Sequence, residues 1–512
     1  MNRSPYNALL MVSLLLTQLP VYGQADPLEG LDQYIENALV EWRVPGLAVA
    51  VVSGDSVIYA KGFGVREVGR PEPVNKHTLF AIASNTKAFT TTALGMLVSQ
   101  GKLSWDDKAT KYLPDFQLHD AWATKELRIR DMLSHKAGYP TWGGDMLWWG
   151  SSFSRAEVLY RYRFQEPRDS FRYRYGYNNI LFIAAGEMIP VITGRSWDDF
   201  ITEEFFQPLG MTRSTTHVSD LPARGNVATP HMLEDGQVIP IPYRDQDNLA
   251  PAAAINSSVW EVSQWLRLQL RYGAYDGVQI VDSAAIRATR TPHTIKSFSV
   301  SSQLLFPTTH FRLYGLGWNL QDYHGGLLVY HTGGMDGMLS ASGFLPERDL
   351  GVVILTNFDD HRLYWALFWH IVDSFLDARE RDWSAYYLEE YLEEAREDQA
   401  AKAEREKTGK KKSKPSRALK YYAGVYENNM MGKVTVSRQG KILSLKLESY
   451  EEGEATLTHW QNDTFTGDWR EPTWLESPVT FTLDDDRKVV SLRFSVVPDF
   501  IDPLVYEFNR ID

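Results

Sequence analysis

The hydrophobic positions near the start of the chain change from a helical period to continuous apolar runs and back again. Apolar residues recur at helical spacing between residues 26 and 43, which predicts an amphipathic helix. Two strands are predicted next, Leu47–Val52 and Val57–Gly62, because each is a short apolar run and turn residues separate them. The helical period returns from Asn85 to Gln100, so a second helix is expected there.

The same patterns recur further along, in the opposite order. Residues from about 105 to 300 form helical patches that Pro, Gly and Trp-rich loops separate. A helix is predicted from about His361 to Leu376, and three consecutive strands are predicted before it: Leu327–His331, Leu339–Phe344 and Val352–Thr356. Strands at both ends with helices between them predict an α+β fold, in which an antiparallel sheet carries a large helical insertion and the two terminal helices cover one face.

The composition changes after this segment. Residues 386–414 are rich in Glu, Lys, Arg and Ala, which predicts a charged helix that runs into a solvated linker. Beyond Pro415 the apolar residues alternate in short runs with turn residues between them, which predicts a small β-barrel. The predicted barrel strands are 434–436, 442–447, 455–459, 464–467, 479–483, 489–497 and 505–508.

The amino terminus has the order of a secretory signal peptide. Arg3 precedes an apolar stretch from Ala8 to Leu16, and small residues follow around Gly23 and Ala25. The alternative is an uncleaved anchor, but the apolar core is shorter than the roughly 20 residues that a membrane span needs. We therefore expect a periplasmic or extracellular protein with no membrane span after cleavage.

Composition excludes several classes of function. The chain has 512 residues, no cysteine and a formal net charge of −12. The absence of cysteine excludes disulfides, thiol catalysis and thiolate metal sites, and the acidic balance argues against a nucleic-acid partner. The twelve histidines are scattered and no His-Glu-x-x-His, Gly-x-Ser-x-Gly or phosphate-loop pattern occurs. We expect no metal and no cofactor.

The first candidate for chemistry is Ser84-Asn85-Thr86-Lys87. Serine becomes a good nucleophile when a neighbour takes its proton, and a lysine with a lowered pKa can do so. A spacing of three residues on a helix places both side chains on one face. The quartet is weak by itself, because an N-cap serine followed by a surface lysine has the same letters; here it follows an apolar approach and opens the predicted helix.

Two further segments strengthen this interpretation. Tyr177 can move protons and Asn179 can orient a substrate amide, although a core tyrosine is the alternative. The run His331-Thr332-Gly333-Gly334 ends a predicted strand, where glycines let a substrate backbone approach and exposed N–H groups hold an oxyanion; an ordinary glycine turn is the alternative. Between Ser84 and Tyr177, the Trp-rich loop 142–149 is expected to line an apolar substrate wall or to pack internally.

The three segments together resemble the serine β-lactamases of the class C type, the DD-peptidases and their esterase relatives. Ser84-x-x-Lys87 resembles the nucleophile motif of that superfamily, Tyr177-x-Asn179 its Tyr-x-Asn motif, and His331-Thr332-Gly333 its Lys-Thr-Gly motif in the His variant. The resemblance implies a signal peptide (1–24), a β-lactamase-like catalytic domain (25–382), a charged helical linker (383–414) and a lipocalin-like β-barrel (415–512).

The resemblance also implies a mechanism of acyl transfer through an acyl-enzyme on Ser84. Lys87 and Tyr177 would manage the proton, and which of them is the base stays open at this point. Asn179, His331 and Thr332 would position the substrate, while the N–H groups of Ser84 and Gly334, beside Gly333, would form the oxyanion hole.

The substrate is expected to be a small molecule or a peptide. The histidine of the third motif is mostly neutral near pH 7, so esters, amides or D-amino-acid peptides are favoured over β-lactams. Two alternatives remain, namely a penicillin-recognising sensor that acylates slowly and a true β-lactamase. The complete set of Ser84, Lys87 and Tyr177 favours an enzyme, and the oligomeric state stays open.

Overall fold

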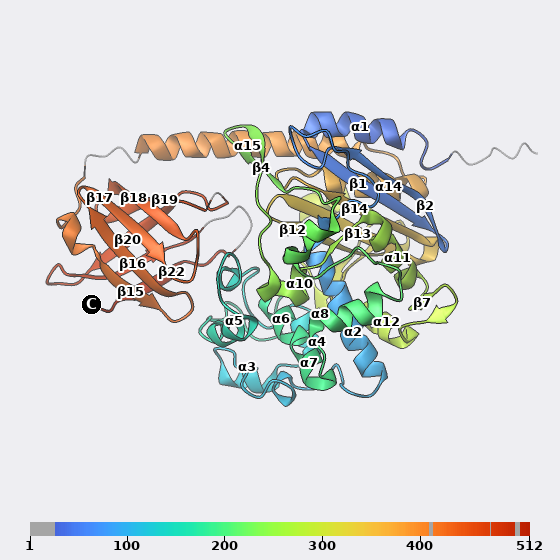
Figure 1. Cartoon of the computed structure of the whole chain (residues 1–512), viewed down its shortest axis with the longest axis horizontal. Helices are drawn as coiled ribbons and strands as arrows, with labels where there is room; N and C mark the ends of the chain where they lie inside the picture. Colours follow the sequence, from blue (N-terminus) through green and yellow to red (C-terminus); the bar gives the residue numbers. More distant parts are fainter. Residues whose placement is uncertain (1–25, 409–412, 472, 497–501) are drawn as a thin grey trace, which may run out of the picture.

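The computed structural model describes residues 26–408, 413–471, 473–496 and 502–512, and the predicted signal peptide lies outside them. Figure 1 shows a large body built around a sheet, a separate barrel to its left, and the long helix α15 (Trp383–Thr408), which extends from the large body toward the barrel. No helix in these described ranges is long and apolar enough to span a membrane.

An eight-stranded antiparallel sheet forms the centre of the large body, in the order β2-β1-β14-β13-β12-β11-β10-β9. The first strand of the chain pairs with the last strand of the domain, with Val49 opposite Ile354. The predicted α+β architecture, in which the chain leaves one sheet and returns to it, is confirmed. The strands are β1 (Gly46–Ser53), β2 (Ser56–Gly64), β9 (Thr294–Ile295), β10 (Arg312–Tyr314), β11 (Asn319–Tyr323), β12 (Gly326–Met335), β13 (Met338–Leu345) and β14 (Leu350–Thr356).

Helices cover both faces of this sheet. The terminal helices α1 (Leu31–Trp42) and α14 (Leu363–Phe375), together with the start of α15, share one apolar cluster with the first face, as Figure 1 shows for α1 and α14. Helices α2 (Thr86–Ser99) and α11 (Val259–Leu270) belong to the larger cluster on the second face. The site described below lies on this second side, because the segment that opens α2 carries it.

The helical insertion is made of short elements. The remaining helices are α3 (Ala121–Glu126), α4 (Ile129–Leu133), α5 (Arg155–Tyr162), α6 (Ile180–Gly186), α7 (Met188–Thr193), α8 (Trp197–Ile201), α9 (Leu221–Arg224), α10 (Ala250–Ala253), α12 (Ser283–Thr289) and α13 (Val300–Leu305). Three small pairs of strands accompany them: β3 (Phe80–Ala81) with β6 (Asn256–Ser257), β4 (His231–Glu234) with β5 (Gln237–Pro240), and β7 (Ala274–Tyr275) with β8 (Val278–Gln279).

Two boundaries differ from the sequence-based expectation for physical reasons. The first helix begins at Leu31 rather than at residue 26, because Gly30 precedes it with a left-handed φ of 76°. The third predicted strand does not end at His331; β12 continues through the motif to Met335, because the whole segment pairs with β13. The glycines of that motif are therefore strand residues rather than a turn.

The carboxyl-terminal part is a closed barrel of eight strands. Strand β15, which no predicted run covered, closes the barrel by pairing with β22, with Tyr426 opposite Arg510. The strands are β15 (Gly424–Asn428), β16 (Gly432–Gln439), β17 (Ile442–Leu447), β18 (Glu454–Gln461), β19 (Thr464–Trp469), β20 (Ser477–Leu483), β21 (Val489–Phe494) and β22 (Tyr506–Arg510).

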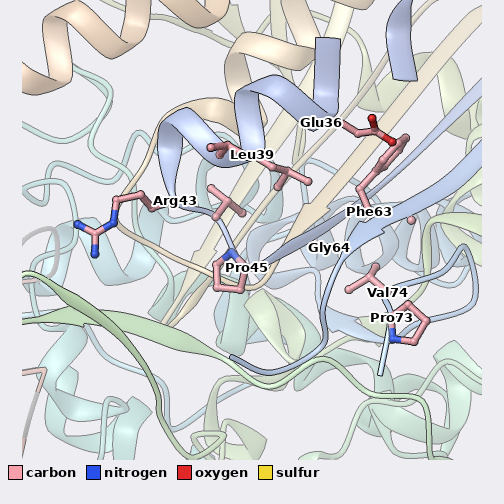
Figure 2. Close-up of a pocket in the computed structure, with 11 residues that line it drawn as sticks. Glu36, Leu39, Arg43, Pro45, Phe63, Gly64, Pro73 and Val74 are labelled. Atoms are coloured by element: carbon pink, nitrogen blue, oxygen red, sulfur yellow. The ribbon is translucent and has the colours of Figure 1, made fainter. Parts of the chain in front are cut away.

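A groove lies at the amino-terminal edge of the large body, between α1 and β2. Figure 2 shows Leu39, Pro45, Phe63 and Val74 in this groove, together with Arg43. Its residues are mainly apolar, and none of the predicted site residues lines it. The groove is therefore separate from the candidate chemistry.

Candidate active site

Ser84 lies in a tight 3₁₀ turn, Ala83–Asn85, immediately before α2. The residue ahead of it, Ala83, is fully buried and has a φ of 47°, a left-handed conformation that is strained for alanine. The Asn85 side chain anchors the turn to β13, because its Nδ2 donates to Ser340 Oγ at 2.8 Å and its Oδ1 accepts from Ser342 Oγ at 2.5 Å. These bonds hold the strained turn, and with it Ser84, in place.

The amino group of Lys87 lies one helical turn further on, completely buried. Its Nζ is 3.0 Å from Ser84 Oγ, 2.7 Å from Asn179 Oδ1 and 3.0 Å from the carbonyl oxygen of Ala252. Burial lowers the pKa of Lys87 to about 7, against the opposing attraction of Asp145. A substantial fraction of this lysine is therefore a neutral amine, able to accept a proton, at neutral pH.

The Tyr177 hydroxyl approaches the same oxygen from the other side. It donates to Ser84 Oγ at 2.8 Å, and the Lys87 ammonium position lies 4.8 Å from the centre of the tyrosine ring. Burial raises the pKa of Tyr177 far above its ordinary value. The phenol therefore keeps its proton and acts as a hydrogen-bond donor to Ser84.

Asn179, directly before α6, connects Lys87 to a carboxyl group that the sequence motifs did not include. Its Oδ1 accepts from Lys87, while its Nδ2 donates to Asp145 Oδ2 at 2.6 Å. Asp145 is fully buried, and burial raises its pKa to about 7. The structure thus adds Asp145 to the predicted site and completes a continuous chain of three polar groups behind Ser84, namely Lys87, Asn179 and Asp145.

His331 faces the site from β12, but the protein itself occupies both of its ring nitrogens. Nδ1 lies 2.6 Å from the Thr332 carbonyl oxygen, which can only accept, so Nδ1 carries the proton. Nε2 then accepts from the Tyr314 hydroxyl at 3.0 Å. Burial lowers the pKa of His331 to about 3, so the ring is neutral and braces Tyr314.

The two glycines of the β12 motif have different surroundings. A Cβ atom on Gly333 would lie 2.4 Å from the Ile82 carbonyl oxygen and 2.5 Å from Ser340 Oγ. The missing side chain therefore lets β12 approach the turn that carries Ser84, and Gly333 also lines the pocket. At Gly334 the nearest atom would be Leu339 Cδ2 at 3.3 Å, so that position is more open.

The predicted site residues meet in one pocket of about 430 Å³. Ser84, Tyr177, Asn179 and the four motif residues His331, Thr332, Gly333 and Gly334 line it, while Lys87 lies buried behind Ser84. Trp142 and Trp148 of the Trp-rich loop also line the pocket. In the described part of the chain, no three His, Asp or Glu side chains group as metal ligands would.

Lys296, directly after β9, brings a cation into this pocket that no sequence motif indicated. Its Nζ donates to Asn319 Oδ1 at 2.5 Å and lies 4.9 Å from the centre of the Tyr175 ring, and all three residues line the pocket. Burial lowers the pKa of Lys296 to about 8, which leaves most of it charged at pH 7. Lys296 follows a two-residue strand with no recognisable pattern, so only the structure places it here.

Comparison with known protein families agrees with this geometry. A family model described as Beta-lactamase matches residues 31–365, well over half of the chain. The chain belongs to the beta-lactamase family. A second model, described as a domain of unknown function (DUF3471), matches residues 408–507, which include barrel strands β15 to β21 and the start of β22.

Relatives of the beta-lactamase-family chain include proteins with hydrolase names. The chain is 29% identical over 390 residues to a protein named unguisins hydrolase ungD' from Aspergillus campestris, a match that covers 72% of this chain and 70% of the relative. It is 25% identical over 343 residues to Protein flp from Staphylococcus aureus, with 65% of this chain and 63% of that relative covered. These similarities confirm the prediction of a serine hydrolase of this family.

A solved structure matches nearly the whole length of this chain. The octameric penicillin-binding protein homologue from Pyrococcus abyssi superimposes with a TM-score of 0.62 at 21% identity, covering 94% of this chain and 99% of that one. The predicted combination of a β-lactamase-like fold with a carboxyl-terminal β-barrel is thereby confirmed.

Proposed function

We propose that this protein hydrolyses ester or amide bonds through an acyl-enzyme on Ser84. The observation that carries the proposal is the position of Ser84 Oγ, which lies 3.0 Å from Lys87 Nζ and 2.8 Å from the Tyr177 hydroxyl at the wall of a pocket. A serine held between a proton acceptor and a proton donor is arranged to attack a carbonyl carbon.

Lys87 is the base in this proposal, and Tyr177 is the proton donor. A neutral Lys87 donates its two N–H groups to Asn179 and to the carbonyl of Ala252, and its lone pair accepts the proton of Ser84. After the transfer, the ammonium has three donors for the same three partners. The phenol of Tyr177, which its raised pKa keeps protonated, gives its proton to the leaving group. The Lys87 ammonium then reprotonates Tyr177, so both residues return to their starting states before deacylation.

The oxyanion site in this proposal consists of the backbone N–H groups of Ser84 and Gly334, which line the same pocket. Water then attacks the acyl group on Ser84 while Lys87 accepts a proton from that water. Tyr177 protonates the departing Ser84 Oγ and regains its proton from Lys87, which restores the starting state. The two groups that transfer protons, Lys87 and Tyr177, are already within hydrogen-bond distance of Ser84 Oγ.

The substrate class follows from the charges in the pocket. His331 is neutral and internally bonded, whereas Lys296 supplies a positive charge. We propose substrates with an acyl group next to an anionic group, such as peptides that end in a D-amino acid with a free carboxylate. The hydrolase name of the Aspergillus campestris relative supports hydrolysis as the reaction class.

A substrate panel tests this function. The panel contains p-nitrophenyl esters, D-amino-acid anilides and a chromogenic cephalosporin, and a fluorophosphonate label is mapped by mass spectrometry. We expect turnover of esters or anilides, label on Ser84, and loss of both in Ser84→Ala, while Ser56→Ala, at an exposed serine of β2, behaves as the wild type. Full activity of Ser84→Ala would overturn the proposal.

The same panel separates the alternatives. Stoichiometric labelling of Ser84 without turnover of any substrate would favour a penicillin-recognising sensor. Turnover of the cephalosporin at a rate above that of the esters would favour a true β-lactamase. Both outcomes keep the acyl-enzyme on Ser84. The first changes whether water releases the acyl group, and the second changes which substrate supplies it.

Export to the periplasm or the extracellular space is part of the proposal. It rests on the charged, apolar and small-residue order of the first 25 residues and on the absence of cysteine from the chain. Amino-terminal sequencing of the protein from its native host tests it: cleavage after Gly23 or Ala25 is expected, and a mature protein that retains Met1 would contradict it.

A further inference from the structure

The β-barrel holds the Trp-rich loop of the pocket at several points. Met146 N donates to Asp502 Oδ2 at 2.9 Å, and the Tyr450 hydroxyl donates to the carbonyl oxygen of Met146 at 2.6 Å. Ser152 N donates to the carbonyl oxygen of Ser449 at 2.8 Å. Asp502 and Tyr450 are barrel residues with 2% and 1% of their surface exposed, so these contacts are buried rather than peripheral.

The clamped position is next to the carboxyl group that reaches the catalytic residues. Asp145 directly precedes Met146, whose N–H and carbonyl are both bonded to the barrel. On its other side, Asp145 Oδ2 accepts from Asn179 Nδ2, and Asn179 Oδ1 accepts from Lys87. Three hydrogen bonds therefore separate the barrel from the amino group that faces Ser84.

Asp145 dictates which way the amide of Asn179 points. A carboxylate oxygen accepts hydrogen bonds, so it attracts the NH₂ end of the amide and leaves the carbonyl end for Lys87. The reversed amide would place NH₂ against the lysine amino group and carbonyl oxygen against carboxylate oxygen, which are both unfavourable contacts. The orientation of Asn179, and with it the place of the Lys87 amino group, depends on where the loop holds Asp145.

We propose that the carboxyl-terminal β-barrel acts as a clamp on the catalytic site: through Asp502 and Tyr450 it fixes the loop so that Asp145 orients Asn179 toward Lys87. Asp145 is in this view a positioning residue, and the barrel is part of the active-site architecture. The inference rests on the proposed function for its effect on activity, but the fixing of the loop is independent of it.

An ion-pair network also contacts the Trp-rich loop, at Trp149. Arg244 pairs with Glu471 of the barrel at 3.0 Å and also with Asp336, in the turn between β12 and β13. Asp336 Oδ2 accepts from the indole N–H of Trp149 at 3.2 Å. The same loop is thus held by the barrel at Met146 and, at Trp149, by a network that joins the barrel to the sheet.

Hydrogen exchange in the full-length protein tests the clamp directly. We expect faster amide exchange in peptides covering residues 142–150 in Tyr450→Phe and Asp502→Ala than in the wild type, because each variant removes a bond to Met146. The matched controls are Tyr422→Phe and Asp463→Ala, a bonded tyrosine and aspartate pair within the barrel. Unchanged loop exchange in both clamp variants, or equal changes in the controls, would overturn the clamp.

The positioning role is tested by the chemistry of Ser84. We expect Asp145→Leu, which has no acceptor, to lower kcat and the rate of fluorophosphonate labelling on the order of a hundredfold with little change in KM. Asp145→Asn retains an acceptor oxygen and should recover most of that loss. Equal rates in Asp145→Leu and the wild type, or no recovery by asparagine, would overturn the role.

The experiments distinguish a failure of the proposed function from a failure of the clamp. If the wild-type protein is not labelled at Ser84 but the clamp variants loosen the loop, the proposed function is wrong and the clamp stands. If the wild type is labelled and the clamp variants leave both the loop and the labelling rate unchanged, the clamp is wrong and the function stands.

Discussion

The hydroxyl of Tyr314 donates a hydrogen bond to Nε2 of His331 at 3.0 Å, while the carbonyl oxygen of Thr332 accepts a hydrogen bond from the Nδ1–H group. This pair of bonds uses both nitrogens of the third motif. The buried histidine is therefore neutral and fixes the Tyr314 side chain through a hydrogen bond.

We expect His331→Gln to keep most of the stability, because glutamine is neutral and can both donate and accept. His331→Lys should lower the free energy of unfolding by about 3 kcal/mol at pH 7, since it buries a charge without a partner. Thermal and chemical denaturation of the two variants measure the difference. If lysine were tolerated better than glutamine, the position would be suited to a cation after all.

The pH dependence of catalysis should follow Lys87. Burial lowers the pKa of Lys87 to about 7, and the base must be neutral to accept the proton of Ser84. We therefore expect kcat/KM to fall about tenfold for each pH unit below 7 and to level off above it. Asp145 also has a pKa raised to about 7, so the observed midpoint belongs to both groups. A constant rate between pH 5 and 8 would contradict this assignment.

The neighbouring glycines of β12 should respond differently to a methyl group. A Cβ on Gly333 would lie 2.4 Å from the Ile82 carbonyl oxygen, so Gly333→Ala should cost about 1–3 kcal/mol of stability and displace the turn that carries Ser84. At Gly334 the closest atom is 3.3 Å away, at the end of the flexible Leu339 side chain. Gly334→Ala should therefore unfold near the wild-type temperature. Equal melting temperatures would refute the close approach at Gly333.

Lys296 should determine affinity rather than rate. It lines the pocket but is not bonded to Ser84, Lys87 or Tyr177. For an anilide with a free carboxylate, we expect Lys296→Gln to raise KM about tenfold with kcat unchanged, because one charge-assisted hydrogen bond is lost. The matched amide-capped substrate should show no change.

A control lysine keeps this prediction specific. Lys76 lies over the Trp260 ring and outside the pocket, so Lys76→Gln should leave both substrates unaffected. If Lys296→Gln changed the capped and uncapped substrates equally, the lysine would shape the pocket rather than bind a carboxylate.

The parts of the site that the sequence predicted are those with a local signature. Ser84 and Lys87 are three residues apart, and Tyr177 and Asn179 precede a strongly apolar helix, so spacing and context were sufficient to single them out. Asp145 and Lys296 have no such spacing. They reach the pocket because the Trp-rich loop and the outer edge of the sheet fold over it, which is tertiary packing that no period along the chain records.

The strands that the sequence did not indicate have a similar explanation. β9 and β10 are two and three residues long, shorter than any period-two pattern needs. The sequence pattern predicts that the strand ends at His331, because the two glycines that follow are typical of a turn. The pairing of Gly333 with Ser340 shows that a neighbouring strand can keep glycines extended when close packing requires it.

The covalent connection between α15 and the barrel has a consequence for how the two bodies stay together. A tethered domain meets its binding surface at an effective concentration of about a millimolar or more. The tether therefore adds to the hydrogen bonds and the ion pair that join the two bodies. A barrel supplied as a separate polypeptide would have to reach a similar concentration to keep the Trp-rich loop in place. A cut of the chain between Thr408 and Gly424 should therefore lower the activity of a dilute solution, because the barrel dissociates, although every catalytic side chain is still present.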